Sequence, residues 1–593
     1  MIIETSFICL RYPVSYYFAV VKLFAFILIL LSSFPLHAKL EICRGVVVHG
    51  HDLDLSDTEK RMVCGDKRLS AYRNIPAYEA KYFFQGFLQS RGHLSPEFKI
   101  ENDVLHVYPG KKSKVENISV TARNHGQEED IEEELEQLYE EEVLDTSTLN
   151  AVEAGARNQM RNMGYPCSDV SSEVLIKKSK IYVSLDDQNK FEFGEVHKEK
   201  IAGLRANALA RYYPFEADQL YDHRLLKLTE KRMTRAEVVQ GTYFLEDCSD
   251  ESFSLSQRFI LGPPRTIRFG VGASTELGPM ARVRWSHNRY KSMASILSAN
   301  LQASFRTQSL TLAADSFLWQ HQPRRSLYSE FEILRESQLE YEQTVMRIKP
   351  HIKWTRDAEG FHKLYTLGPT YEAGTFRSTE KVETRSFSTG IIEGGMVWTS
   401  HDYEFFDIHP QDGEVYNLNF DFRHPSMGFF HELLKLNSSV LKLSRLTSSG
   451  RGDIIGGARL NMGTTWISRE LPHERLPPTV KFFGGGSDDI RGFQLQTLPD
   501  NQGLGALTKL GVKLELRRTY LFRETIEAFT FYDFAWFGDK SWDIDPAIYA
   551  SPGLGLRWIS PIGLVQGFVA RGFKSKPYKD FGNLYFIGIG GVF

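Results

Sequence analysis

The second part of the chain, from residue 263 onward, alternates between apolar and polar residues. Three segments show the pattern clearly: SANLQASFR (298–306), NLNFDFR (417–423) and LGVKLELRR (510–518). In each of them the apolar side chains would share one face of a strand, and the polar side chains would share the other. A period of two residues is typical of β-strands with two different faces. A soluble sandwich alternates in the same way, so the period alone does not tell whether the apolar face meets a protein core or lipid.

Residues 39–262 combine short strands with amphipathic helices instead. The segment VENISVTA (115–122) alternates as a strand, and the acidic segment that follows it places Ile131, Leu135 and Leu138 at helical spacing. We interpret the acidic residues as a solvated helix face, and a partner surface is the alternative. A second helix over 151–163 and strands over 171–177 and 180–185 complete a unit of the order β-α-α-β-β.

The same order of elements recurs on both sides of this unit. The later copy comprises a strand in FEFGEVHKEK (191–200), helices over 204–210 and 218–235, and strands near 240–246 and 253–260. The weaker first copy comprises a strand in EICRGVVVHG (41–50), a helix over 76–89 and a hairpin in EFKIENDVLHVYP (97–109). Recurrence at about 75 residues predicts a repeat array. The predicted units are 39–113, 114–188 and 189–262.

The N-terminus carries an export signal. Lys22 precedes the apolar run 23–31, and the small-residue pattern that ends at Ala38 is an acceptable cleavage site. Because this run is shorter than a membrane-spanning helix requires, we predict a signal peptide over 1–38 and a mature chain that begins near Lys39. An uncleaved helical anchor is the alternative.

The composition and the cysteine spacing limit the partners, disulfides and cofactors that we expect. The 71 basic and 74 acidic residues nearly balance, so we expect no nucleic-acid partner. Removal of Cys9 with the signal leaves four cysteines, which allow three disulfide connectivities, and Cys43 with Cys64 is the preferred pair because the two are close in sequence. Four reduced thiols are an equal alternative. Cys-x-x-Cys and His-x-x-x-His spacings are absent from the sequence, so we expect no metal and no cofactor.

Several features together favour a membrane barrel over residues 263–593. At about 20 residues per strand and turn, this length predicts roughly sixteen strands, which lies within the range of outer-membrane barrels. The sequence after the signal has no apolar run of about 18 residues that could span a bilayer as a helix, and it ends on an aromatic residue, Phe593. The predicted fold is therefore a set of α+β repeats followed by an all-β barrel of sixteen strands.

One long segment of the barrel, about 468–506, shows little alternation and contains FFGGGSDDIRGF (482–493). Its glycines do not match a phosphate-binding loop or a dinucleotide fingerprint. Loops longer than about 12–15 residues are usually functional or disordered, and the apolar residues here favour a position inside the barrel. Arg491 would then need a buried carboxylate. Asp533 and Glu515 are the candidates, and a guanidinium can bind a carboxylate through two parallel hydrogen bonds.

These motifs resemble the Omp85 superfamily, in which periplasmic POTRA repeats precede a sixteen-stranded outer-membrane barrel. The TamA family, the outer-membrane subunits of the translocation and assembly module, is the most similar. The tip of the sixth extracellular loop in the superfamily, [VI]-R-G-[FY], is matched by Ile490, Arg491, Gly492 and Phe493. The other similar segments are the first hairpin (269–285), a late strand (553–565) with Arg557, Ser560, Pro561 and Gly563 in place, and the closing strand (584–593).

One motif departs from the superfamily. Its pattern F-x-D-x-G on a late strand is present as Phe531, Asp533 and Ala535, so that alanine stands where glycine is expected. We therefore expect a misfit at Ala535 wherever close packing depends on the missing Cβ.

The resemblance implies an assembly factor in the bacterial outer membrane, with three POTRA units in the periplasm. It implies a lateral seam between the first and last barrel strands, in contact with the lipid bilayer. The implied partners are a TamB-like protein anchored in the inner membrane and unfolded outer-membrane or autotransporter-type clients. The seam residues are Val271, Gly588, Ile589, Gly590 and Phe593. Glycines weaken strand packing, as a seam requires, although they could instead fit a crowded interior.

Two other functions are weighed against this one. A two-partner-secretion pore shares the superfamily and the R-G-[FY] tip, and exports one dedicated exoprotein through its interior. Such pores have two POTRA units that are preceded in the chain by a plug helix. Here strand-like sequence begins at Cys43, close to the predicted mature terminus, so we expect no plug helix. An outer-membrane enzyme is the second alternative. The sequence contains neither G-x-S-x-G nor H-E-x-x-H, so we predict that the protein is not an enzyme.

Overall fold

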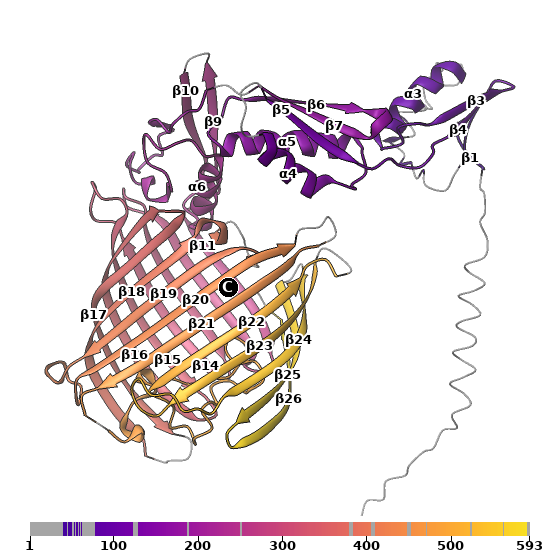
Figure 1. Cartoon of the computed structure of the whole chain (residues 1–593). Helices are drawn as coiled ribbons and strands as arrows, with labels where there is room; N and C mark the ends of the chain where they lie inside the picture. The colour runs from indigo at the N-terminus through magenta and orange to yellow at the C-terminus, as the bar shows by residue number, and fades with distance from the viewer. Residues whose placement is uncertain are drawn as a thin grey trace, which may run out of the picture. The chain divides into compact units, whose positions relative to one another are not determined.

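A computed structural model gives the fold of the chain (Figure 1). The described residues are 39–43, 45–49, 53, 55–56, 58–59, 61, 77–122, 128–186, 189–249, 252–378, 383–404, 410–447, 452–469, 471–521, 525–560 and 563–589. The predicted signal peptide lies outside them. None of the helices in this part of the chain combines the length and the apolar character needed to cross a bilayer.

The first α/β unit is a four-stranded sheet with a helix packed on it. Its elements are β1 (Lys39–Cys43), β2 (Val46–His49), α3 (Ala77–Ser90), β3 (Glu97–Glu101) and β4 (Val104–Tyr108), in the sheet order β1-β2-β4-β3. Phe84 and Leu88 of α3 are fully buried against Leu105 and Val107 of β4. The single strand predicted over 41–50 is in fact two antiparallel strands, because the chain turns at Gly45, where φ is +81°.

The second α/β unit follows the predicted order of elements. It comprises β5 (Asn117–Ala122), α4 (Glu128–Tyr139), α5 (Thr146–Asn162), β6 (Asp169–Leu175), a 3₁₀ helix (Ile176–Lys178) and β7 (Lys180–Asp186), in the sheet order β5-β7-β6. Ile131 and Leu135 of α4 are buried as their spacing predicts. Leu138, which the same spacing places with them, is 42% exposed, since α4 ends one residue later and its last turn leaves the core.

The third α/β unit has one long helix. Its elements are β8 (Val196–Lys198), a 3₁₀ helix (Ala210–Tyr212), α6 (His223–Arg235), β9 (Gly241–Ser249) and β10 (Ser252–Ile260), in the sheet order β8-β10-β9. The helix predicted over 204–210 is wrong. Tertiary hydrogen bonds hold this segment in turns, among them Arg205 N to Ser292 O at 2.9 Å. The helix predicted from Asp218 begins instead at His223, because the Asp222 side chain caps it.

The rest of the chain forms a closed barrel of sixteen antiparallel strands, the number that the length of this region predicts (Figure 1). In chain order the strands are β11 (Arg265–Ser274), β12 (Gly278–Tyr290), β13 (Ser295–Ser304), β14 (Thr307–Ser316), β15 (Arg325–Ser337), β16 (Tyr341–Ala358), β17 (Phe361–Ser378), β18 (Arg385–Ser400), β19 (Gly413–Arg423), β20 (Leu433–Thr447), β21 (Ile454–Ile467), β22 (Thr508–Arg518), β23 (Ile526–Gly538), β24 (Tyr549–Ser560), β25 (Gly563–Ser575) and β26 (Tyr578–Ile589). Short helices include α7 (His401–Glu404) after β18 and a 3₁₀ helix (Pro425–Met427) after β19.

The direction of the apolar side chains decides between a sandwich and a membrane barrel. Leu301, Leu418 and Leu514 belong to the apolar faces of three alternating segments, and they are 52%, 42% and 45% exposed. A soluble barrel would turn these side chains inward, whereas a barrel in lipid turns them outward. The apolar face of the strands is therefore the lipid-facing wall, and the polar face lines the interior.

Candidate functional site

The segment between β21 and β22 folds back into the barrel interior. It contains two 3₁₀ helices, His473–Arg475 and Pro478–Val480. Its side chains contact β17 on one wall and β23 on another, which is a span that only an interior position allows. Ile490 and Phe493 at its tip are buried. We call the segment 468–507 the lumen loop.

Arg491 holds the tip of the lumen loop on the barrel wall. Its Nε and Nη2 donate to Asp533 Oδ2 and Oδ1 at 2.8 and 2.7 Å, and its backbone N–H donates to Oδ2 at 3.1 Å. The Nη1 group donates to Glu515. The guanidinium also stacks on the Phe531 ring, 3.6 Å from its centroid. Since Arg491 is 3% and Asp533 0% exposed, the pair is a buried, two-pronged ion pair.

Glu515 connects this pair to further arginines. Its Oε1 accepts from Arg557 Nη1 at 2.9 Å and lies 3.3 Å from Arg517 Nε. The structure thus gathers Arg491, Asp533, Glu515, Phe531 and Arg557, which the sequence places on four separate segments. Gly563 begins β25, outside this cluster. Pro561 lies outside the described residues.

Ala535 causes no misfit where glycine was expected. Its side chain is fully buried in one apolar cluster with Ile490, Phe493, Phe537 and Tyr549. The Cβ therefore adds to the apolar surface on which the loop tip packs.

The close approach that requires a missing Cβ lies on β24 instead. Gly553 is paired with Phe531, and a Cβ at Gly553 would lie 2.2 Å from the Phe531 ring, which is too close. Arg491 stacks on the same Phe531 ring. The absence of a Cβ at Gly553 therefore allows the ring to take the position in which it contacts the guanidinium.

The glycine run sharpens the turn before Arg491. Gly485 and Gly486 have φ values of +98° and +104°, which favour glycine. A Cβ at Gly485 would lie 2.1 Å from the carbonyl oxygen of Gln494. Asp489 closes the turn, since its Oδ2 accepts from Gly485 N–H at 3.0 Å and from Lys509 Nζ at 2.7 Å.

A second set of contacts fixes the lumen loop near Thr479, and the sequence did not predict it. Glu372 of β17 accepts from Thr479 Oγ1 in the loop at 3.1 Å and from Arg423 Nη1 at 2.9 Å. Its other oxygen accepts from Arg347 Nε at 2.8 Å. Lys435 Nζ donates to the Thr479 carbonyl at 2.7 Å. The alternation indicates that these side chains face inward, but it does not say which of them meet.

The contact between the first and last strands is short. Among the described residues β11 pairs with β26 at two positions, Ala273 with Ile589 and Ser274 with Gly588, whereas β12 pairs with every residue of β11. Thr275 N–H also donates to the Ile587 carbonyl at 3.0 Å. We call this contact the seam.

Val271 and Ile589, two of the residues expected at the seam, do not lie opposite each other. The register places Ala273 opposite Ile589, so Val271 lies two residues away along β11, and it is 81% exposed. The seam is staggered, so its register could not be counted from the strand sequences. Gly590 and Phe593 lie outside the described residues.

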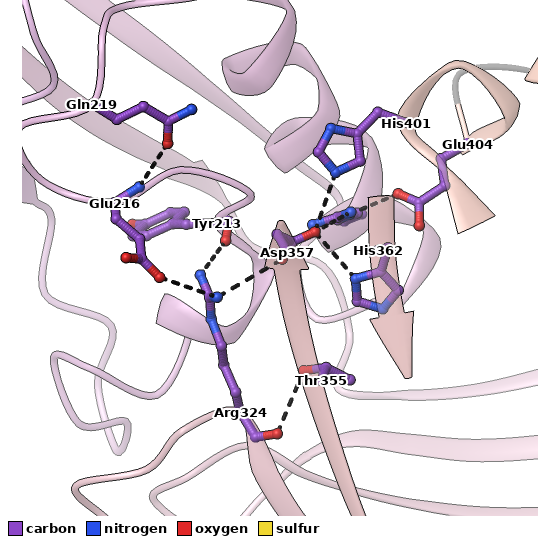
Figure 2. Close-up of polar contacts among 10 residues, drawn as sticks. Tyr213, Glu216, Gln219, Arg324, Thr355, Asp357, His362, His401 and Glu404 are labelled. Atoms are coloured by element: carbon purple, nitrogen blue, oxygen red, sulfur yellow. Dashed lines mark hydrogen bonds and ion pairs between the residues drawn. The ribbon is translucent and has the colours of Figure 1, made fainter. Parts of the chain in front are cut away.

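A cluster of charged residues joins the third α/β unit to one rim of the barrel (Figure 2). Asp357, at the end of β16, accepts from Arg232 Nη2 of α6 at 2.8 Å, and ring nitrogens of His362 and His401 lie 3.2 and 3.3 Å from the same oxygen. Arg232 Nε also donates to Glu404 at 2.8 Å. Within the described residues no three His, Cys, Asp or Glu side chains are arranged to hold a metal ion.

A disulfide and an ion pair connect α5 and the segment after it to β9. Cys167 is bonded to Cys248, so, of the three connectivities, only the one that also pairs Cys43 with Cys64 remains. That second pair stays a prediction, since Cys64 lies outside the described residues. Glu246, two residues before Cys248, accepts from Arg161 Nη2. Burial opposes its ionisation, but hydrogen bonds from His223, Tyr221 and Arg161 lower the pKa of Glu246 to about 2.

A sixteen-stranded closed barrel behind POTRA-like α/β units is the architecture of one superfamily of outer-membrane proteins. The model of the Omp85 superfamily domain matches residues 252–593, which is more than half of the chain. This chain belongs to the Omp85 superfamily, and its barrel implies an outer-membrane location.

Solved structures of low sequence identity resemble the chain. BamA from Haemophilus ducreyi lacking POTRA domains 1–3 is 12% identical, with 81% of this chain and 100% of that chain covered and a TM-score of 0.48. CdiB from Acinetobacter baumannii is 13% identical, with 87% and 98% covered and a TM-score of 0.47. CdiB from Escherichia coli is 13% identical, with 87% and 99% covered and a TM-score of 0.46.

Proposed function

We propose that this protein is a TamA-like assembly factor, which inserts or translocates β-barrel or autotransporter-type clients through the seam between β11 and β26. The observation that carries the proposal is the short pairing at the seam: two residue pairs are described there, whereas β12 pairs with β11 along its whole length. A closed barrel satisfies all of its backbone groups, and breaking a long strand pair in lipid is expensive. Opening the seam breaks the fewest described pairs.

An opened seam would offer a client two strand edges. Unpaired N–H and C=O groups of an edge strand add an incoming strand by backbone hydrogen bonding, which does not depend on the client's sequence. The exposed face of β11 beside the seam is apolar, with Ile267 and Phe269 pointing outward like Val271. A client strand added here would extend the apolar face and would meet lipid directly.

The three α/β units would lie in the periplasm and bind a TamB-like partner anchored in the inner membrane. Sheet edges suit such a contact, because β3 is an edge strand of the first sheet and most of its residues are exposed. Three α/β units also agree with the three POTRA units that the resemblance to the TamA family implies.

A two-partner-secretion pore is the second candidate. The barrel interior beside the lumen loop contains a cavity of about 510 Å³, which is lined in part by Tyr341, Arg347 and Lys435. A secretion pore could form if this cavity widened into a continuous channel. Export through the interior requires the loop to leave, however, and the loop is fixed to Asp533 at one wall and to Glu372 at another. The two anchors favour the seam as the route.

Two engineered crosslinks separate the candidates. A disulfide between Ala273→Cys and Ile589→Cys locks the seam, and a reducible bis-methanethiosulfonate crosslinker, which spans the longer distance of an ion pair, joins Asp489→Cys to Lys509→Cys and locks the loop tip to β22. Cells depleted of the wild-type protein would be complemented with each variant, and the outer-membrane proteome would be measured with and without reductant. We expect the seam lock to block client assembly reversibly. Normal assembly by the seam-locked protein would refute the proposal, and a block by the loop lock alone would favour the pore.

A further inference from the structure

We propose that Glu276 is a positioning residue that keeps the seam closed, by tying the first barrel hairpin to the tip of the lumen loop. The inference rests on the proposed function, since it assigns the control of the seam to a named contact. Glu276 lies in the turn that joins β11 to β12, between Ser274 and Gly278. The loop tip would therefore fasten the seam in addition to the backbone pairs of β11 and β26.

On the side of the first strand, the tie is a set of hydrogen bonds to one carboxylate. Ser487 Oγ donates to Glu276 Oε2 at 2.6 Å, and Ser487 N–H donates to Oε1 at 3.1 Å. Hydrogen bonds to a charged acceptor are about twice as strong as neutral ones. Thr275, the residue before Glu276, donates its N–H to the Ile587 carbonyl of β26. The tie thus acts one residue away from the seam.

On the side of the last strands, the same loop tip packs on β25 and β26. The Phe493 ring meets the Phe581 ring edge to face, with 5.0 Å between centroids. The Gly492 carbonyl lies so near Gly572 that a Cβ there would be 2.5 Å from the oxygen. Asp500, farther along the loop, forms an ion pair with Lys579 of β26. The loop therefore contacts both sides of the seam.

Hydrogen bonds and one ion pair hold the short segment between these contacts in a fixed conformation. Gly486 N–H donates to the Phe493 carbonyl at 3.0 Å, and Asp489 N–H donates to the Gly486 carbonyl at 3.1 Å. Arg491 fixes the middle of the segment to Asp533. When β11 and β26 separate, either Ser487 must leave Glu276 or the whole tip must leave β25 and β26. The position of the loop then controls the opening of the seam.

The test measures the seam itself. Spin labels at Val271 and Tyr585, which are both exposed on the outer wall, report the separation of β11 and β26 in the full-length protein in lipid nanodiscs. We expect Glu276→Ala and Ser487→Ala to raise the population with a widened seam about tenfold, the effect of losing one charge-assisted hydrogen bond. Thr497→Ala is the matched control, because it removes another hydroxyl of the lumen loop, whose hydrogen bond goes to the Gln494 carbonyl of the same loop.

Rescue distinguishes positioning from a general loss of stability. Ser487→Thr keeps the hydroxyl and should keep the closed distance, and Glu276→Lys with Ser487→Asp should restore it by reversing the pair. An unchanged distance distribution in Glu276→Ala and Ser487→Ala would overturn the inference. If Glu276→Ala does not fold, the Ser487 variants decide. A seam-locked protein that assembles clients normally would refute the proposed function, whereas an unchanged seam distance refutes the tie alone.

Discussion

Arg491 and Asp533 bind each other through two parallel hydrogen bonds inside the barrel, although 42 residues of chain separate them. The arginine comes from a loop and the aspartate from a strand, so the pair fixes an otherwise irregular segment to a rigid wall. Because both side chains are buried, neither can exchange its partner for water. The loop tip and everything that it contacts therefore depend on this pair.

We predict that Arg491→Ala destabilises the barrel by about 3–5 kcal/mol, since it leaves a buried carboxylate without its partner. Arg491→Lys should lower the stability by less, because it keeps the positive charge beside Asp533. It should still lower it, because a single ammonium cannot bind both oxygens of Asp533 in the same plane. Unfolding in urea, followed by the heat-dependent migration of the folded barrel in gels, measures both changes.

The matched variant for this prediction is Asp533→Asn, alone and combined with Arg491→Ala. If the two residues act as a pair, the double variant should lose less stability than the sum of the single variants. Additive losses would show that Arg491 acts through its contact with Glu515 or through the Phe531 ring instead.

The Arg491–Asp533 contact could be predicted from the sequence because the two features that indicate it are local. The glycine-rich loop demands an inward turn, and the period of two along β23 places Asp533 on the same face as Phe531. Glu372, Glu276 and the Asp357 cluster could not be read in this way. Several of their partners come from loops and helices far away in the chain, such as Ser487 of the lumen loop for Glu276 and Arg232 of α6 for Asp357, and only the folded barrel brings them together.

The register of the seam gives a second prediction. Cysteines at Ala273 and Ile589 lie directly opposite each other, so they should form a disulfide rapidly under mild oxidation. Cysteines at Val271 and Ile589 are offset by two residues and should crosslink at least several-fold more slowly, because opposite positions lie about 5 Å apart and diagonal ones about 7–8 Å apart. Gel mobility with and without reductant gives both rates. Faster crosslinking of the Val271 pair would mean a different register.

The disulfide gives a third prediction. Cys167→Ser with Cys248→Ser should destabilise the α/β part of the chain by about 2–4 kcal/mol, because the unfolded chain regains the freedom that the crosslink removes. Calorimetry of the full-length protein should show a lower midpoint for the transition of the α/β units. The barrel transition serves as the internal control and should not move. A fall in both midpoints would mean that the disulfide also supports the barrel.

Glu246 gives a prediction about pH. Its pKa is lowered from 4.5 to about 2 in the folded protein, so its contribution to stability is complete above pH 4.5 and is lost as the pH falls towards 2. The midpoint of the α/β transition should fall steeply over this window in the wild type. Glu246→Gln should start lower at pH 6 and fall less steeply. Parallel curves for the two proteins would show that other carboxylates cause the acid sensitivity.

The last prediction concerns the contact between the third α/β unit and the barrel rim. Arg232 bridges Asp357 and Glu404, which lie on different barrel segments, and both carboxylates are largely buried. Arg232→Ala leaves the two acids without their shared cation, so the unit should become free to swing on the barrel. Spin labels at Tyr243 and Leu318, both exposed, should then give a broader distance distribution. Lys227→Ala is the matched control, since Lys227 lies on the same helix and pairs with Glu230 on that helix. An equally narrow distribution in Arg232→Ala would show that the remaining contacts at this rim are enough to hold the unit.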